Sequence, residues 1–240
     1  MKKTKINTVF IDLEGTITDD ETLNCFVSDP DLKGHSFGGI LRELLVTKYK
    51  LTPRDALTIL NSVTEPCGHI DPFYFISHSD YDITEEELWR EILAWQRDHL
   101  IIYDDAVKMI RQLYESNYKL YMVSNCARTA VYSQLNSAGL AEKLSSGYFV
   151  DVYGCFDLGA TKDDPEVYKT ILLQSGINPD EVVMVGNEPA IDLESPHKAG
   201  IGHSVIVNRE LPEAFKISGK DVFVNSLELV PGLMDTINCL

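Results

Sequence analysis

Short runs of apolar residues alternate with amphipathic stretches along much of this chain. A short, uninterrupted apolar run bounded by polar residues is typical of a strand that is buried on both faces. Five such runs stand out: Thr8–Ile11, Leu120–Val123, Val182–Val185, Val205–Val207 and Val222–Val224. The second follows an amphipathic stretch at Asp105–Glu115, and the third follows one at Pro165–Gln174. This alternation predicts βαβ units, and hence a Rossmann-like α/β core whose parallel sheet has the last two runs at its edge.

The segment between the first and second runs has a different pattern. It shows no convincing buried strand, and turn-forming pairs such as Asp29-Pro30 and Gly38-Gly39 interrupt it. Helical periodicity is found in three stretches: Gly39–Lys48, Pro53–Val63 and Glu85–His99. We therefore predict that residues 19–99 form an inserted all-helical subdomain, and that residues 1–18 and 100–240 form the α/β core.

Charge narrows the classes of partner. The chain has 240 residues with an ordinary globular composition, and its formal net charge is −16. Such a surface repels nucleic acid backbones and anionic lipids, so we expect neither as a partner. It also repels a phosphate ester. A site for an anionic substrate must therefore contain local positive charge from a metal ion, a lysine or a helix N-terminus.

The number of cysteines and the lengths of the apolar runs indicate in which cellular compartment the protein is expected. The five cysteines are an odd number and form no CxxC pair, which favours reduced thiols in the cytosol over a disulfide framework. The apolar run near the N-terminus is too short for a signal peptide, and no run reaches the roughly 20 residues that cross a membrane. We expect a cytoplasmic protein without a membrane partner, and the sequence gives no indication of its oligomeric state.

Two carboxylates follow the first predicted strand. In an open parallel sheet, ligands bind outside the carboxyl ends of the strands, so the residues after each run are the candidates for chemistry. Asp12 and Glu14 are two apart and would lie on the same side of an extended chain, and Gly15 permits a sharp turn before Thr16. One carboxylate could attack a substrate while the other transfers a proton. A polar strand end followed by a turn explains the same residues.

Polar residues also follow the second and third runs. Ser124 and Asn125 could hold a phosphate oxygen at a helix start, or could simply cap that helix. Lys162 precedes a predicted helix, where it could neutralise a phosphate or remain a solvated surface lysine. Asn187 and Asp192 follow the third run with oxygen atoms that suit Mg²⁺, although acidic residues also favour a helix N-terminus.

Taken in order, these motifs resemble those of the haloacid dehalogenase-like hydrolase superfamily. The family has four motifs at the ends of successive strands, and the resemblance covers about residues 5–18 and 100–230. The inserted segment stands where the family has a helical cap of the first type. The resemblance implies a phosphatase of a small phosphorylated metabolite that works through an aspartyl-phosphate and uses Mg²⁺.

The resemblance also implies residue roles. Asp12 would be the nucleophile, Glu14 the general acid and base, and Lys162 the screening cation. Substrate binding would fall to Thr16, Ser124 and Asn125. The metal would be held by Asp12, the backbone carbonyl of Glu14, and Asn187 and Asp192 of the last motif.

Two positions depart from the usual family pattern. Most family phosphatases have Asp where this chain has Glu14, although the enolase-phosphatase branch has a similar Asp-Ile-Glu-Gly-Thr motif. The last motif usually begins Gly-Asp, whereas here it is Gly186-Asn187, with one negative charge fewer for the metal. Two alternatives follow from these departures. One is a metal-independent 2-haloacid dehalogenase, which Glu14 disfavours, and the other is a non-catalytic relative that binds a ligand or partner.

Overall fold

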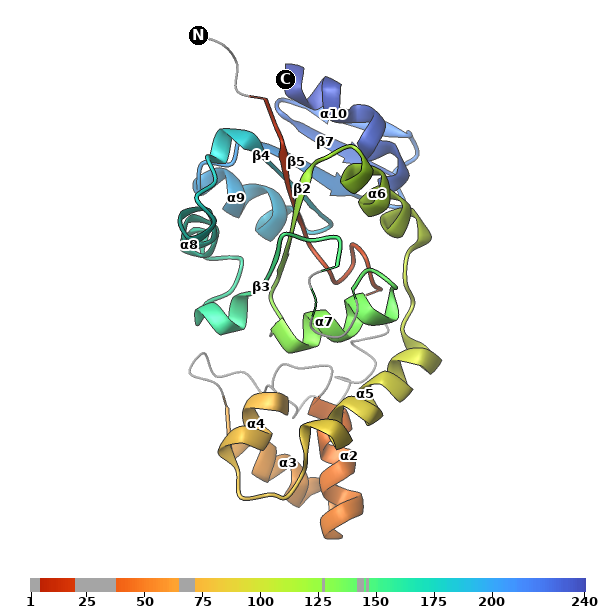
Figure 1. Cartoon of the computed structure of the whole chain (residues 1–240), viewed down its shortest axis with the longest axis vertical. Helices are drawn as coiled ribbons and strands as arrows, with labels where there is room; N and C mark the ends of the chain where they lie inside the picture. Colours follow the sequence, from red (N-terminus) through yellow and green to blue (C-terminus); the bar gives the residue numbers. More distant parts are fainter. Residues whose placement is uncertain (1–4, 20–37, 65–71, 127, 142–144, 146) are drawn as a thin grey trace.

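The protein consists of a sheet covered by helices and a smaller group of helices beside it (Figure 1). The computed structural model describes residues 5–19, 38–64, 72–126, 128–141, 145 and 147–240. None of the described helices is both long enough and apolar enough to cross a bilayer. The description below refers to these residues.

One sheet contains all the described strands, in the order β3-β2-β1-β4-β5-β7-β6. Their bounds are β1 Thr8–Ile11, β2 Lys119–Ser124, β3 Asp151–Gly154, β4 Val182–Gly186, β5 His203–Val207, β6 Phe215–Ser218 and β7 Asp221–Val224. Strand β1 is parallel to both neighbours, with Thr8 aligned to Lys119 on β2 and to Val182 on β4. The carboxyl ends of β1, β2 and β4 therefore meet at one edge, and the predicted α/β fold is confirmed.

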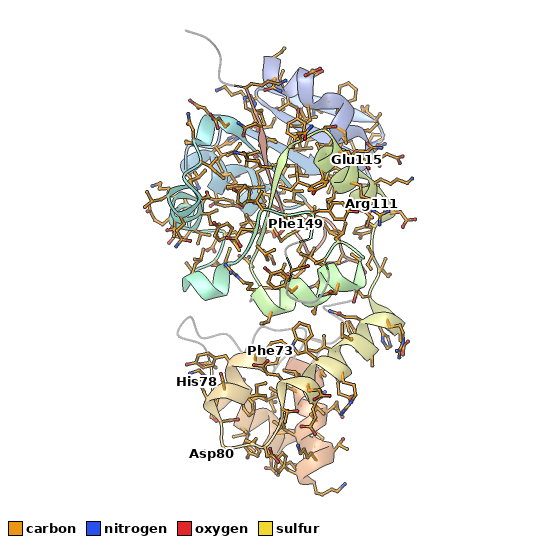
Figure 2. The ribbon with its side chains drawn as sticks, in the orientation of Figure 1. Phe73, His78, Asp80, Arg111, Glu115 and Phe149 are labelled. Atoms are coloured by element: carbon orange, nitrogen blue, oxygen red, sulfur yellow. The ribbon has the colours of Figure 1, made fainter. Side chains whose placement is uncertain are left out.

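The sheet is covered on both faces, which is why its strands are apolar without interruption. Val9 and Ile11 point into a cluster with residues of α6 (Asp104–Glu115), α7 (Arg128–Ser137) and α10 (Val230–Cys239). Phe10 points to the opposite face, where α8 (Pro165–Ser175) packs. Side chains fill the space on both sides of the strands (Figure 2). Since every residue of β1 is buried, a register slip would cost apolar burial on either face.

The second group of helices lies between β1 and β2 in the sequence. Its members are α2 (Gly38–Tyr49), α3 (Pro53–Ser62), α4 (Pro72–His78) and α5 (Glu85–His99). Helices α2, α3 and α4 share an apolar cluster of their own, which includes Leu41, Leu60 and Phe75. The described residues of this group contain no strand, in agreement with the sequence pattern. Residues 20–37 and 65–71 lie outside the described residues, and the limits of an inserted subdomain at 19–99 stay a prediction.

Helix α5 attaches this group to the sheet part through α7. Leu88 and Ile92 of α5 belong to the large apolar cluster of the sheet. The amide Nε2 of Gln96 donates to Ser133 Oγ at 2.9 Å, and Ser137 Oγ donates to Gln96 Oε1 at 2.9 Å. The amide of Gln96 is thus paired on both sides, which fixes α5 against α7.

Several elements have no clear pattern of their own in the sequence. Helix α7 lacks a clear amphipathic pattern because every residue from Ala130 to Leu135 is buried. Strand β6 is exposed along its whole length, and its pairing with β7 is the one antiparallel pairing among the described strands. The last two apolar runs were expected at the sheet edge, but β6 lies outside β7 and forms that edge itself. Strand β3 forms the other edge, and α4 and α10 were also not anticipated.

Candidate active site

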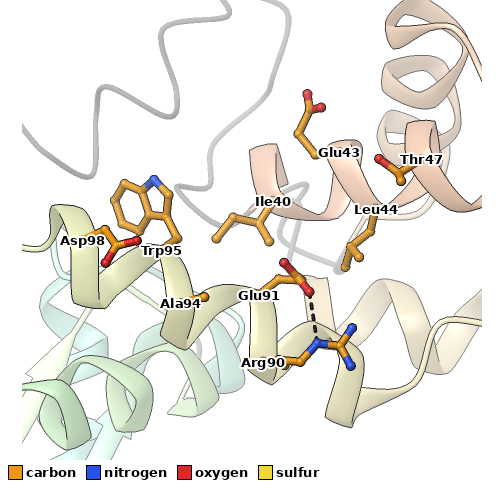
Figure 3. A pocket seen from close by; sticks show the side chains of 9 residues that line it. All are labelled: Ile40, Glu43, Leu44, Thr47, Arg90, Glu91, Ala94, Trp95 and Asp98. Carbon is orange, nitrogen blue, oxygen red and sulfur yellow. Dashed lines mark hydrogen bonds and ion pairs between the residues drawn. The ribbon is translucent and has the colours of Figure 1, made fainter.

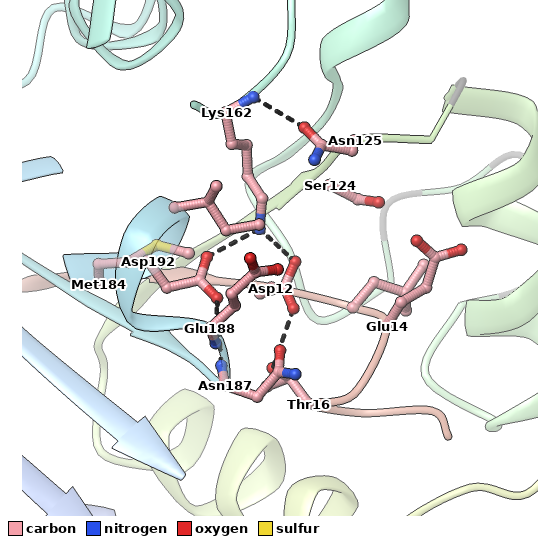
Figure 4. A network of polar contacts seen from close by, with 12 residues as sticks. Asp12, Glu14, Thr16, Ser124, Asn125, Lys162, Met184, Asn187, Glu188 and Asp192 are labelled. Carbon is pink, nitrogen blue, oxygen red and sulfur yellow. Dashed lines mark hydrogen bonds and ion pairs between the residues drawn. The ribbon is translucent and has the colours of Figure 1, made fainter. Parts of the chain in front are cut away.

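The carboxyl ends of β1 and β4 bring a buried lysine and two carboxylates together (Figure 4). Asp12 directly follows β1, and its backbone N–H donates to the carbonyl oxygen of Val185 at 2.9 Å. Lys162 Nζ donates to Asp12 Oδ1 and, at 2.8 Å, to Asp192 Oδ1. Lys162 is only 1% exposed, so this ion group is withdrawn from water.

Asp192 anchors the lysine and the turn after β4. It lies in the π-helical turn η3 (Ala190–Glu194), a type of turn that is frequent at functional sites. Its Oδ2 accepts the backbone N–H groups of Asn187 at 3.1 Å and Glu188 at 3.0 Å, while Oδ1 accepts from Lys162. A Cβ on Gly186 would lie 2.2 Å from Asp192 Cγ, which explains the glycine. Both oxygens of Asp192, which we expected to bind metal, are therefore engaged.

Burial and mutual attraction set the protonation of this group. The pKa of Asp12 is raised to about 7, because burial and the nearby Asp192 carboxylate together outweigh the lowering effect of Lys162. Burial alone would lower the pKa of Lys162, but Asp12 and Asp192 raise it well above its ordinary value. Lys162 therefore stays protonated, and the carboxylate form of Asp12 depends on the lysine.

The turn after Asp12 holds the carboxylate in place. Gly15 has a φ of +76°, and a Cβ there would lie 2.2 Å from the Asn187 amide nitrogen. Thr16 is fully buried, and its hydroxyl donates to Asp12 Oδ2 at 3.0 Å. The sequence predicted Thr16 as a substrate-binding residue. The structure places its hydroxyl against the Asp12 carboxylate, which it orients, and its part in binding substrate stays a prediction.

The side-chain amide of Asn187 lies close to two oxygens of this turn. One terminal amide position lies 3.1 Å from both Asp12 Oδ2 and the Glu14 carbonyl oxygen. An amide nitrogen there donates to both, whereas an amide oxygen there completes a group of three oxygens. About 3.0 Å is the oxygen–oxygen edge of a Mg²⁺ octahedron with bonds of roughly 2.1 Å. The donor set therefore fits Mg²⁺ when the amide oxygen faces inward.

Such a site differs from a cluster of acidic or thiol ligands. The described residues contain no group of three or more His, Cys, Asp or Glu side chains that could hold a metal ion. An ion between Asp12, the Glu14 carbonyl and Asn187 would depend on one carboxylate, one backbone carbonyl and one amide. It would therefore be held by less negative charge than the usual Gly-Asp form of the motif.

The loop after β2 closes the other side of the site. Ser124 is buried at the end of β2, where its Oγ accepts the Cys126 backbone N–H at 3.0 Å. Asn125 Oδ1 accepts the Lys162 backbone N–H at 2.8 Å and so ties this loop to the lysine loop. The resulting pocket has a volume of about 180 Å³, and its lining consists of Asp12, Glu14, Asn125, Lys162, Asn187, Glu188 and Ile191.

This fold and geometry agree with a comparison with known families. The family model of the haloacid dehalogenase-like hydrolases matches residues 6–200. The chain belongs to this family. Pyrophosphatase PpaX of Listeria monocytogenes is 28% identical over 185 residues, which are 76% of this chain and 75% of the relative. (S)-2-haloacid dehalogenase 4A of Burkholderia cepacia is 28% identical over 159 residues, which are 65% of this chain and 66% of the relative.

Solved structures with this fold include both phosphatases and dehalogenases. A haloacid dehalogenase-like phosphatase from Thermococcus onnurineus superimposes with a TM-score of 0.62 at 22% identity, over 95% of this chain and 98% of that one. L-2-haloacid dehalogenase from Xanthobacter autotrophicus superimposes with a TM-score of 0.56 at 17% identity, over 96% and 98%. At these identities the likeness shows the fold alone, and the chemistry must be argued from the site.

Two residues beside Glu14 in this hydrolase were not anticipated from the sequence. Cys126 Sγ donates to Glu14 Oε1 at 2.8 Å, and Gln134 Nε2 donates to the same oxygen at 3.4 Å. Burial raises the pKa of Cys126 well above its ordinary value, and the nearby Glu14 carboxylate adds to the effect. The thiol therefore stays protonated and donates. The one signal in the sequence is that Cys126 follows the Ser124-Asn125 motif directly.

Arg209 supports the turn after Asp12 from the side of β5. Its guanidinium donates to the carbonyl oxygens of Gly15 and Thr16, each at 3.0 Å, and to Asp105 Oδ1 at 3.2 Å. It also stacks on Tyr103, with 3.5 Å from Cζ to the ring centroid. Its position just after β5, at the carboxyl edge, was a signal that the sequence contained. The turn after Asp12 is thus held through its backbone carbonyls as well as through its side chains.

A separate pocket lies between α2 and α5 (Figure 3). Its volume is about 460 Å³, and its lining is Ile40, Glu43, Leu44, Thr47, Arg90, Glu91, Ala94, Trp95 and Asp98. None of these residues belongs to the motifs at the strand ends. This pocket is larger than the one beside Asp12, but it does not contain the buried ion group that marks the candidate site.

Proposed function

We propose that this hydrolase is a Mg²⁺-dependent phosphatase of a small phosphorylated metabolite. The observation that carries the proposal is the Asp12 carboxylate. Lys162 holds one of its oxygens, and the other faces the Glu14 carbonyl and the Asn187 amide. A nucleophile set between a cation and a potential metal site suits attack on an anionic phosphoryl group, because both neighbours reduce the repulsion between two anions.

In the first step, an Asp12 oxygen attacks phosphorus, and the bond from phosphorus to the ester oxygen breaks. The proton for the departing oxygen comes from Glu14, which ends as a carboxylate. The Lys162 ammonium, fixed by Asp192, stabilises the negative charge on the phosphoryl oxygens. The products of this step are the free alcohol and an aspartyl-phosphate at Asp12.

In the second step, Glu14 removes a proton from water as its oxygen attacks phosphorus. The bond between phosphorus and the Asp12 oxygen breaks, which restores the carboxylate and releases inorganic phosphate. Glu14 ends protonated, ready for the next substrate. Ser124 and Asn125 lie beside the pocket, and we assign the phosphoryl oxygens to this loop and to Lys162.

We assign the ion to Asp12, the Glu14 carbonyl and the Asn187 amide oxygen. Bound there, Mg²⁺ would supply positive charge that lowers the repulsion between nucleophile and substrate. Asp192 has a different part, since both of its oxygens already accept hydrogen bonds. It orients Lys162 and the turn that presents Asn187.

A metal-independent 2-haloacid dehalogenase is the second candidate. The similarity to the Burkholderia cepacia dehalogenase favours it, as does an uncharged amide at Asn187. Glu14 disfavours it, because a dehalogenase of this family has no carboxylate at that place. The similarity to pyrophosphatase PpaX supports the phosphatase and adds inorganic pyrophosphate to the substrates worth testing.

A paired release assay separates the two candidates. The purified protein is incubated with pyrophosphate, a panel of small phosphate esters and a set of 2-haloalkanoic acids, each in Mg²⁺ and in excess EDTA. We expect phosphate release that needs Mg²⁺ and no halide release. Halide release in EDTA without phosphate release would reject the phosphatase and establish the dehalogenase.

Replacing Glu14 by Gln is expected to slow hydrolysis of an alkyl phosphate by about 10²–10⁴-fold, the usual effect of losing a general acid and base. The loss should be smaller for p-nitrophenyl phosphate, whose leaving group needs little protonation. Steady-state kinetics on both esters measure the difference. Glu188→Gln is the matched control, since Glu188 lines the same pocket and loses the same charge. Equal losses of kcat/KM on both esters would show that Glu14 is not the acid, because kcat/KM reports only the steps up to departure of the alcohol.

Replacing Asn187 by Asp is expected to tighten Mg²⁺ binding by on the order of tenfold, because hard cations favour anionic oxygen. The new carboxylate would also face Asp12 Oδ2, so the metal-free variant should melt lower and regain stability as Mg²⁺ is added. Calorimetric titration and thermal melts with and without Mg²⁺ measure both effects. Asn178→Asp, at an exposed turn, is the control. Unchanged Mg²⁺ affinity would show that Asn187 does not bind the ion.

A further inference from the structure

The carboxylate of Glu14 has its own hydrogen-bond donors inside the protein. In Figure 4 its carboxylate lies apart from the cluster of Lys162, Asp192 and Asp12. Its Oε1 accepts from Cys126 Sγ at 2.8 Å and from Gln134 Nε2 at 3.4 Å. Both donors come from β2–α7, more than a hundred residues further along the chain. The contact is therefore a tertiary one and involves the carboxylate, not the backbone, of Glu14.

The length of glutamate accounts for this contact. Glu14 has one methylene more than the aspartate usual at this place, which lets its carboxylate extend away from Asp12 toward α7. Gln134 is held ready for it, since its Oε1 accepts the Thr18 hydroxyl at 2.8 Å and this leaves Nε2 facing Glu14. Gln134 and Thr18 are fully buried, and Cys126 is 4% exposed.

The chemistry of the two donors suits a group that must gain and lose a proton. Cys126 and Gln134 are neutral, and each contributes a hydrogen bond without a full positive charge. A lysine or arginine in their place would strongly favour the ionised form of Glu14 and hinder its reprotonation. Neutral donors orient the carboxyl group through hydrogen bonds alone.

We propose that Cys126 and Gln134 are positioning residues that set where the acid–base group Glu14 stands. The inference rests on the proposed function, since it assigns a place to the acid and base of that reaction. It predicts a specific kinetic signature. Misplacing Glu14 should lower kcat/KM, which reports the steps up to departure of the alcohol, for substrates that need a proton on the leaving group, and should spare kcat/KM for those that do not.

The kinetic test uses Cys126→Ala, Cys126→Ser and Gln134→Leu. We expect Cys126→Ala and Gln134→Leu to lower kcat/KM on an alkyl phosphate by about ten- to a hundredfold, since a small misplacement of a catalytic group has effects of this size. On p-nitrophenyl phosphate the loss should be less than about threefold on the same reasoning. Cys126→Ser keeps a donor and should restore most of the rate. Cys155→Ala, an equally buried thiol on the other sheet face, is the control.

A double variant decides whether the effect passes through Glu14. In a Glu14→Gln background the acid is already lost, so adding Cys126→Ala should change kcat/KM less than about twofold. A full additional loss in that background would overturn the proposal, and so would equal losses on the two esters in the single variant. Unchanged kinetics in both Cys126→Ala and Gln134→Leu would overturn it as well.

An infrared measurement tests the contact without any turnover. The S–H stretch of Cys126, obtained as the difference between wild type and Cys126→Ala, moves to lower frequency when the thiol donates to a carboxylate. We expect it to move back to higher frequency in Glu14→Ala. An unmoved band would overturn the proposal. A band that moves in a protein without phosphatase activity would reject the proposed function and leave the Cys126–Glu14 contact established.

Discussion

Asp12→Asn is expected to abolish turnover, by at least about 10⁴-fold in kcat, and to leave the fold intact. The amide has the size of the carboxylate but cannot attack phosphorus. Lys162 keeps Asp192 as its partner, so no buried cation is left unpaired. Measurement of kcat on the best substrate, together with circular dichroism, tests both parts. Asp180→Asn, at an exposed turn, is the control.

Stability gives this variant a second readout. Burial raises the pKa of Asp12 to about 7 in the folded protein, above its value in the unfolded chain. The group therefore favours folding at low pH, and this contribution is lost as the pH rises through about 7. In metal-free protein, the melting temperature of Asp12→Asn should therefore rise relative to that of wild type as the pH increases through about 7. Activity above a few percent of wild type would instead show that another group attacks.

Lys162→Met is expected to be the most destabilising of these substitutions as well as inactive. Removing the lysine leaves the buried Asp12 and Asp192 carboxylates facing each other without a cation, and breaking a buried ion group in this way costs about 3–5 kcal/mol. The negative charge on the phosphoryl group of the substrate also loses its fixed counterion, so kcat should fall by about 10²–10³-fold. Urea unfolding and steady-state kinetics measure the two effects.

A second substitution separates these two effects. Asp192→Asn added to Lys162→Met removes one of the two stranded charges, while its amide oxygen can still accept the backbone N–H groups of the turn. The double variant should regain part of the stability and none of the activity. Lys169→Met, on the exposed surface of α8, is the matched control. Wild-type stability in Lys162→Met would contradict the buried ion group.

The parallel sheet and its functional edge could be predicted because the signals for them are local. Each apolar run of β1, β2 and β4 is short enough for a strand and apolar enough to need cover on both faces. Parallel strands that follow one another through helices end at the same edge, so Asp12, Ser124 and the residues after β4 had to meet there. The helices α2, α3 and α5 were likewise visible in their periodicity.

Local patterns failed where burial or exposure was uniform. Helix α7 is buried over most of its length and therefore has no polar face for a periodicity to reveal. Strand β6 is exposed throughout and has no apolar run. Pairing with β7 makes it a strand, and that pairing depends on the position of β7 in the sheet.

The tertiary structure alone decided which contacts each side chain of the site makes. Residue type predicted that Thr16 binds substrate and that Asp192 binds metal. Which of their oxygens already take part in hydrogen bonds depends on neighbours that are distant in the sequence. Cys126, Gln134 and Arg209 reach the turn after Asp12 from 112 to 194 residues away, and no local pattern encodes such contacts. The sequence by itself indicated Asp12, Lys162 and the edge of the sheet where they meet. Folding decided which groups hold them in place, since that depends on which side chains share the same buried volume.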